Sequence, residues 1–158
     1  EGTNGIQAID LVGRKLPSAG GAVVMAFFSE ISGFLAELEN AGDEFASMHS
    51  GLAAALGQLQ QATGWLAANG MEDPNQALAG ATPYLEMFGL VAGGYYLARS
   101  AVIARRLTED GNADVPFLEA KIVTARFYCE QLLPRTAGLA PSVTAGKRDL
   151  FALDTGQF

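Results

Sequence analysis

The first five residues of the chain combine side-chain types that suit proton transfer beside a bound cofactor. Glu1 supplies a carboxylate, and an apolar pocket would raise its pKa toward neutrality, which makes a better general base. Gly2 lets the backbone approach a substrate closely. Thr3, Asn4 and Gly5 suit an open helix N-terminus, where free N–H groups and the positive dipole end favour phosphates. By pattern alone, the same residues also fit a polar loop with a helix cap.

A short helix is expected to follow this start. Thr3 or Asn4 is the expected N-cap, and Gln7 stands at the N3 position if Asn4 is the cap. The helix would present one apolar stripe at three- and four-residue steps and end at Pro17. The expected stripe is Ile6, Ile9, Val12 and Leu16.

These residues resemble a known family. Residues 1–7, EGTNGIQ, and 10–16, DLVGRKL, are similar to the late segment of flavin-dependent acyl-CoA dehydrogenases. The similarity is greatest to the branch that carries an extra C-terminal helical domain and includes 3-methylthiopropanoyl-CoA dehydrogenases. The matching run covers about a tenth of the chain, residues 1–16.

The resemblance implies a role for each of the first five residues. It makes Glu1 the catalytic base that takes the α-proton of an acyl-CoA thioester, and it places Gly2 against the acyl group. It places Thr3, Asn4 and Gly5 along FAD, although many relatives carry a longer side chain where Gly5 stands. It also implies an electron-transfer acceptor and a homo-oligomer.

The chain begins on the residue that would be the base, so we expect a C-terminal fragment of a larger dehydrogenase. The fragment alone should be inactive and should not hold FAD, because most of the flavin and acyl pockets would be missing. The alternative is a stand-alone helical module for assembly or partner docking, with no activity of its own.

Composition excludes several other classes of function. Lys and Arg number 10 against 17 Asp and Glu, which argues against nucleic acid and anionic membrane surfaces as partners. One cysteine excludes an internal disulfide, and without a signal-like segment we expect a cytoplasmic protein. The most apolar run, 87–98, lies between Glu86 and Arg99 and is too short to span a bilayer, so no membrane span is expected.

Four longer helices are expected after a linker at residues 17–21, which carries a proline and two glycines. The alternative to a linker is a phosphate-binding loop at residues 17–21, but the segment lacks the lysine and the spacing of such loops. The helices should cover roughly residues 22–40, 43–70, 75–108 with a kink at Pro83, and 114–133. Their short connections predict an all-α fold, an antiparallel up-and-down four-helix bundle.

The expected domain division follows from these elements. Residues 1–16 would end the catalytic domain, residues 22–138 would form the bundle, and residues 139–158 would be a loose tail. The expected core seams are Val24, Phe27, Phe28, Ile31, Phe34, Leu35 and Leu38; Phe45, Met48, Leu52, Leu56, Leu59 and Leu66; Leu85, Phe88, Val91, Tyr95 and Val102; and Leu118, Ile122, Ala125, Cys129 and Leu132.

A few other residues could carry chemistry, but a structural role suits them better. His49 has no second ligand for a metal, so no metal site is expected; Trp65 suits the rim of the core, and Cys129 suits an inert core position. Tyr95 and Tyr96 with Arg99, Arg105 and Arg106 could form a nucleotide patch, although a solvated face or interface fits the negative charge better. Gly93-Gly94 predicts a close approach by another helix, in the bundle or across a dimer.

Overall fold

A computed structural model describes residues 3–111 and 114–157 of the chain. Every regular element in these ranges is helical, which confirms the all-α prediction. The α-helices are α1 (Thr3–Asp10), α2 (Ala22–Glu39), α3 (Ala46–Glu72), α4 (Pro74–Ala79), α5 (Ala81–Glu109), α6 (Val115–Gln131) and α7 (Arg135–Thr144). Shorter turns are a π-helix at Leu11–Lys15 and 3-10 turns at Ser18–Gly21, Asp43–Phe45, Asp149–Phe151 and Thr155–Gln157.

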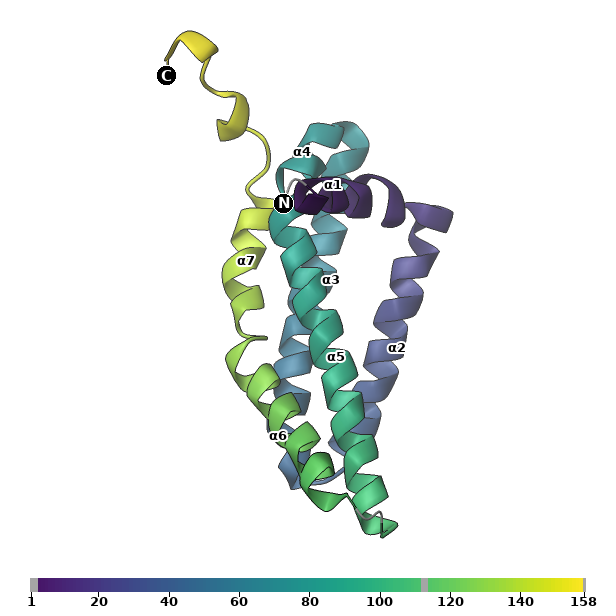
Figure 1. The fold of residues 1–158 in the computed structure, drawn as a ribbon. Helices are drawn as coiled ribbons and strands as arrows, with labels where there is room; N and C mark the ends of the chain where they lie inside the picture. Colours follow the sequence, from purple (N-terminus) through teal and green to yellow (C-terminus); the bar gives the residue numbers. More distant parts are fainter. Residues whose placement is uncertain (1–2, 112–113, 158) are drawn as a thin grey trace.

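The long helices lie side by side along one axis, with α6 and α7 following one another in the same row (Figure 1). Helix α5 packs against α6 and α7, and α3 packs against α2, α6 and α7. Helix α1 lies across one end, near α4, and contacts α5. The described chain forms seven α-helices, so it is divided into more segments than the four-helix bundle expected from sequence. The up-and-down topology of that bundle stays a prediction.

Most of the predicted core positions are buried. All six predicted seam residues of α3 and its preceding turn, from Phe45 to Leu66, are buried, as are most of those in α2 and α6. Helix α5 differs, because Leu85 and Phe88 are only partly buried while Tyr84 and Met87 are fully buried. Its sequence is apolar on several sides, so periodicity alone could not select the face that points inward.

The expected kink at Pro83 is wrong. The chain instead breaks at Gly80, between α4 and α5, and Pro83 lies in the first turn of α5, where a missing N–H is tolerated. A Cβ atom at Gly80 would clash with the backbone carbonyl of Val143. The glycine therefore lets α7 approach the α4–α5 junction closely.

The expected end of regular structure near Gly138 is also wrong, because α7 runs through it to Thr144 and contains Pro141. Thr136 and Val143 are buried, so packing against α3 and α5 stabilises this helix despite its proline. Beyond α7 the chain forms two short turns that extend away from the bundle (Figure 1). The division into domains at residues 16, 21 and 138 stays a prediction.

The close approach predicted for Gly93-Gly94 is confirmed, and the neighbour is within this chain. A Cβ atom at Gly93 would lie 2.5 Å from the Tyr128 hydroxyl, and one at Gly94 would lie 2.9 Å from the methyl groups of Leu133. Tyr128 also donates a 3.3 Å hydrogen bond to the carbonyl of Leu90. The two glycines thus let α5 and the end of α6 pack closely together.

Two helical segments, Ser18–Glu39 and Ala81–Glu109, are long and apolar enough to cross a membrane by length and composition. Half of the α5 segment's apolar window is buried inside the bundle, as in the core helix of many proteins without a membrane span. The window in the first segment is less buried and lies near the N-terminus. The expected absence of a membrane span stays a prediction.

Candidate functional site

The first turn of α1 carries three of the five expected site residues. Thr3, Asn4 and Gly5 are all exposed there, whereas Glu1 and Gly2 lie outside the described residues. Thr3 and Asn4 are not caps as expected, because both lie within the helix and a cap has non-helical backbone angles. Their N–H groups belong to the first turn, which has no intrahelical acceptors. A role for these N–H groups toward a bound phosphate stays a prediction.

The inward face of α1 differs from the expected apolar stripe. Ala8, Leu11 and Val12 are buried, while the side chains of Ile6 and Ile9 are 65% and 55% exposed. Small Ala8 faces the bundle where α1 contacts α5, and the wider π-helix that follows turns both Leu11 and Val12 inward. The segment with the expected site thus offers two large apolar side chains on its open side.

A charged cluster follows on the same segment. Arg14 binds both carboxylate oxygens of Asp10, at 2.5 and 2.9 Å, and the Lys15 ammonium lies 3.3 Å from the same carboxylate. The hydrogen bond from Arg14 holds the pKa of Asp10 below its ordinary value, with Lys15 adding to the effect. Asp10 therefore stays ionised and is a poorer general base than a carboxylate in an apolar pocket.

The expected linker at residues 17–21 is a tight corner. Ala19, Gly20 and Gly21 have φ values of 50°, 66° and 86°, all in the left-handed region. Such angles suit glycine, and Ala19 is the one non-glycine residue with a positive φ in the part of the chain that the structure describes. The Gly20 N–H donates to the Pro17 carbonyl at 3.0 Å, so the corner is held by its own backbone.

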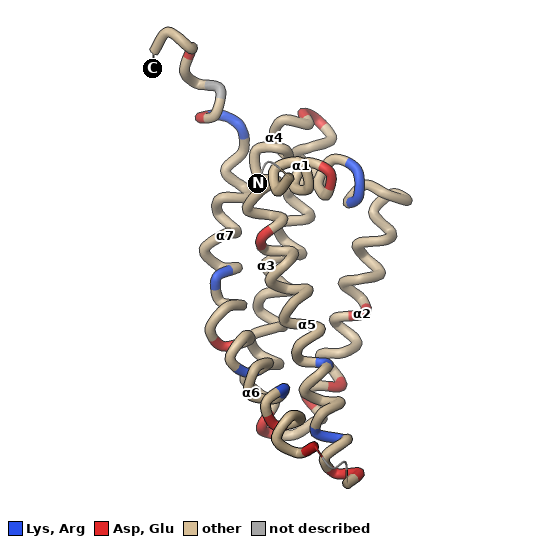
Figure 2. Tube along the Cα trace, viewed as in Figure 1, with Lys and Arg blue, Asp and Glu red and all other residues tan. Residues whose placement is uncertain are grey.

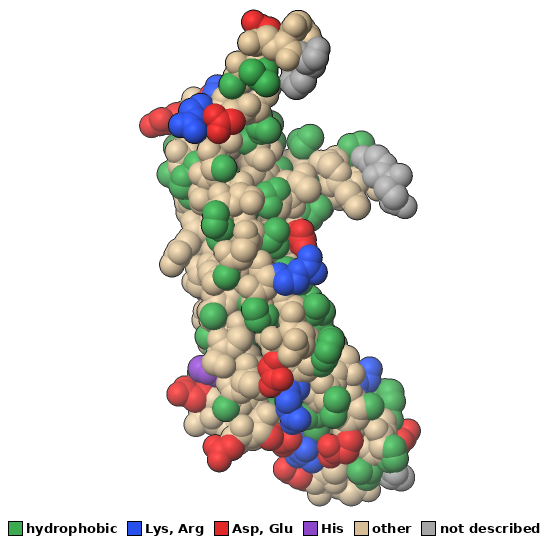
Figure 3. Space-filling view, turned by 90° about the vertical axis from the view of Figure 1, so that its left-hand side faces the viewer, with side chains coloured by type: hydrophobic (Ala, Val, Ile, Leu, Met, Phe, Trp, Pro, Cys, Tyr) green, Lys and Arg blue, Asp and Glu red, His purple; other side chains and the backbone are tan. Residues whose placement is uncertain are grey.

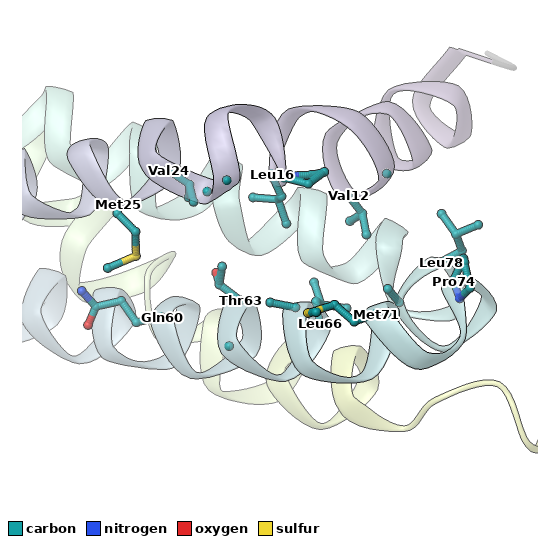
Figure 4. Close-up of a pocket in the computed structure, with 18 of the residues that line it drawn as sticks. Val12, Leu16, Val24, Met25, Gln60, Thr63, Leu66, Met71, Pro74 and Leu78 are labelled. Carbon is teal, nitrogen blue, oxygen red and sulfur yellow. The ribbon is translucent and has the colours of Figure 1, made fainter.

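An apolar cavity of about 930 Å³ lies between this corner, α2 and α3 (Figure 4). Met25 of α2 lies opposite Gln60 of α3, Leu16 and Val12 lie opposite Leu66 and Met71, and α4 closes one end. Sequence reasoning missed this site. One sequence feature could have indicated it: the run from residue 45 to 71 contains no Asp, Glu, Lys or Arg. Many of these positions in α3 are nevertheless exposed in the structure.

The other single candidates behave as structural residues. His49 and Trp65 are partly buried, as expected of a flank and a rim position, and burial raises the pKa of the Cys129 thiol to about 11. A thiol so rarely ionised is a poor nucleophile. Among residues 3–111 and 114–157, no group of His, Cys, Asp and Glu is arranged to hold a metal.

The arginines of α5 bind carboxylates of neighbouring elements, which disfavours a nucleotide patch. Arg99 and the Tyr95 hydroxyl both donate to Glu30 of α2, at 3.2 and 2.6 Å. Arg106 binds Glu37 at 2.5 Å. Acidic and basic residues are most frequent toward the end of the molecule near the α5–α6 connection (Figures 2 and 3).

Arg105 joins three elements at this end. It donates two hydrogen bonds to Glu44, of 2.6 and 2.8 Å, and one of 2.9 Å to Glu119 of α6. Glu44 precedes α3, so one guanidinium connects the start of α3 with α5 and α6. The hydrogen bonds from Arg105 hold the pKa of Glu44 below its ordinary value.

Replacing Arg105 by methionine should destabilise the fold by on the order of 1–2 kcal/mol near pH 7, because the charge-assisted bonds to two partly buried carboxylates are lost. A carboxylate with a depressed pKa stabilises the fold above its unfolded pKa of about 4.3 and loses that effect as the pH falls through the folded value. The difference between Arg105→Met and the parent should therefore shrink below about pH 4. Thermal unfolding at pH 7 and pH 3 measures both effects.

Arg148→Met is the matched control, since Arg148 pairs with Asp149 in the exposed segment after α7, with side chains 87% and 80% exposed. It should leave the melting temperature unchanged at either pH. Equal melting temperatures for Arg105→Met and the parent at pH 7 would contradict a stabilising role for this network.

The chain matches the family described as "Acetyl-CoA dehydrogenase C-terminal like" over residues 27–154. It belongs to the acyl-CoA dehydrogenase family. It is 37% identical over 134 residues to 3-methylmercaptopropionyl-CoA dehydrogenase of Ruegeria pomeroyi, an alignment that covers 84% of this chain and 22% of the relative. It is 32% identical over 143 residues to a butyryl-CoA dehydrogenase of Syntrophomonas wolfei, covering 87% of this chain and 23% of the relative.

A second butyryl-CoA dehydrogenase of Syntrophomonas wolfei is 27% identical over 158 residues, which covers 98% of this chain and 25% of that protein. The chain therefore spans about a quarter of the length of the curated relatives that it matches. The expected resemblance is thereby confirmed at the level of the family.

Proposed function

We propose that this chain is the C-terminal part of an FAD-dependent acyl-CoA dehydrogenase that introduces an α,β double bond into an acyl-CoA thioester. The family match at residues 27–154 carries the proposal. The motif at residues 1–16 precedes that match, so it supports the same family independently.

In the proposed reaction, the Glu1 carboxylate accepts the α-proton of the thioester, and Gly2 leaves room for the acyl group beside it. The α-carbon is a weak acid, so the proton leaves only toward a positioned base while polar groups stabilise the negative charge on the thioester oxygen. FAD bound along Thr3, Asn4 and Gly5 would supply the acceptor for the hydride that leaves the neighbouring carbon.

The first turn of α1 fits a position along FAD. Thr3, Asn4 and Gly5 are exposed, and the N–H groups of this turn lack intrahelical acceptors. A Cβ atom at Gly5 would meet nothing within 4 Å, so this chain leaves space beside the backbone at that position. Such a helix end suits the phosphates of a dinucleotide.

The helices after residue 21 are proposed to serve assembly of a cytoplasmic homo-oligomeric enzyme that passes electrons to a separate acceptor. The side chains of Val23 and Met25 in α2 are 59% and 57% exposed, and Ile6 and Ile9 of α1 add to this apolar surface. Exposed apolar groups gathered at one end of a chain favour contact with other polypeptide. The same observation supports the alternative of a docking module without activity.

The flavin content of two proteins tests this proposal. The purified 158-residue chain should be colourless, because the chain supplies only one edge of the expected flavin site, whereas the full-length gene product should be yellow. Adding acyl-CoA of several chain lengths to the full-length protein should bleach the visible absorbance of its oxidised flavin. A full-length product that purifies without flavin, or whose flavin no acyl-CoA reduces, would contradict the proposed reaction.

A further inference from the structure

The cavity between α2 and α3 has the dimensions of a ligand site. Its volume of about 930 Å³ falls within the roughly 300–1,000 Å³ of typical small-molecule sites. Val24, Phe28 and Leu66 in its lining are only 7%, 2% and 3% exposed, whereas Met25 and Met71 are 57% and 88% exposed, so the cavity has a buried part and an open rim.

The lining is apolar along its whole length. No charged residue lines the cavity in the described part of the chain, and its two polar side chains are Gln60 and Thr63. The Thr63 hydroxyl donates to the Leu59 carbonyl and accepts from the Tyr84 hydroxyl, each at 2.7 Å. Thr63 is therefore already satisfied, and the polar side chain left for a ligand is the exposed amide of Gln60 at one end (Figure 4).

The cavity is elongated along α3. Gln60 and Met71 mark its two ends on this helix, and a rise of about 1.5 Å per residue separates them by roughly 16 Å. Gly64 lies between them, and a Cβ atom there would meet nothing within 4 Å. Glycine is unfavourable inside a helix, and no contact within the described chain requires this one. Its missing side chain keeps the middle of the cavity open.

We infer that this cavity binds an elongated, uncharged aliphatic molecule, with any polar end near Gln60. An apolar cavity holds water poorly and binds apolar molecules instead. The flexible thioethers of Met25 and Met71 on opposite walls suit an aliphatic ligand of variable shape. The cavity shares no lining residue with Glu1–Gly5, so the inference does not depend on the proposed dehydrogenase site.

The four methionines of the chain provide an internal test. Met25 and Met71 line the cavity, whereas Met48 and Met87 are 0% exposed in the core and do not line it. Titration of ¹³C-methyl-methionine-labelled chain with 1-decanol should shift the Met25 and Met71 signals saturably and leave the other two in place. No saturable shift up to the solubility limit of decanol, or equal shifts of all four signals, would overturn the inference.

Gly64→Leu should fill the cavity and weaken decanol binding at least tenfold without loss of folding, since its Cβ has free space. Gly57→Leu is the matched control, because Gly57 lies two turns earlier in α3, has equal space for a Cβ and does not line the cavity. Ala67→Leu is a second filling variant should Gly64→Leu fold poorly. Parental binding by both filling variants would overturn the inference.

Light scattering without decanol measures the mass of the protein and so tests whether a second copy of the chain, rather than a small ligand, occupies the cavity. The Met25 and Met71 signals should not depend on protein concentration. A dimeric mass that appears together with shifts of these two signals would assign the cavity to contact between copies, and the inference of a small ligand would fail.

Discussion

Glu1→Gln in the full-length enzyme is expected to preserve acyl-CoA binding and to slow flavin reduction by about 10²–10⁴-fold, the usual contribution of a general base. Glutamine keeps the size and hydrogen-bonding capacity of glutamate, but its amide cannot accept the α-proton. Rapid mixing with acyl-CoA and recording of flavin bleaching measures the rate, and the dependence of that rate on acyl-CoA concentration reports binding.

Asp10→Asn is the control, because Asp10 is the nearest other carboxylate along the chain. Arg14 and Lys15 lower its pKa and hold it as a structural ion, so its loss should leave flavin reduction near the parent rate. Flavin reduction at the parent rate in Glu1→Gln would remove Glu1 from the mechanism. The first turn of α1 would then be only the start of a helix.

Replacing Gly93 and Gly94 together by leucine is expected to lower the stability of the fold by about 2–4 kcal/mol. The new side chains must occupy space held by the Tyr128 hydroxyl and the Leu133 methyl groups, 2.5 and 2.9 Å from the ideal Cβ positions. The gain in helix propensity, about 1 kcal/mol for each glycine replaced, offsets part of this cost. For a chain of this size the melting temperature should fall by roughly 5–15 °C.

Gly89→Leu provides the control on the same helix. Gly89 is exposed, and a Cβ atom there would meet nothing within 4 Å, so leucine should leave the melting temperature unchanged or raise it. Opposite effects at two sites a turn apart would show that packing against α6, rather than loss of glycine, decides the outcome. An unchanged melting temperature in the double variant would contradict the close approach of α5 and α6.

Apolar periodicity predicted those parts of the fold in which one helix face is clearly more apolar than the others. The seam of α3 from Phe45 to Leu66 is an example, since small or polar residues separate its large side chains. The same rule could not choose the inward face of α5. It also missed α7, because Pro134 and Gly138 are local signals for a helix end, and the packing of Val143 that overrides them involves residues far apart in the sequence.

The candidate site was predictable to a different extent. The motif at residues 1–16 indicated the family, but no periodicity could place Ile6 and Ile9 on the open side of α1. That position follows from the contact of Ala8 and Leu11 with the bundle and from the π-helical turn after Asp10. The uncharged run at residues 45–71 was a signal for the cavity, but locating it required knowledge of how the left-handed corner at residues 19–21 and α2 lie relative to α3.

Cys129 makes the opening of this molecule observable without any added label. It is the one cysteine in the sequence, it is 1% exposed, and a Cβ atom at Gly51 of α3 would lie 2.9 Å from its backbone carbonyl oxygen. A thiol reagent can reach the sulfur only when these helices separate, and the raised pKa slows reaction further. The rate of thiol modification in native buffer therefore reports how often α3 and α6 separate by local unfolding.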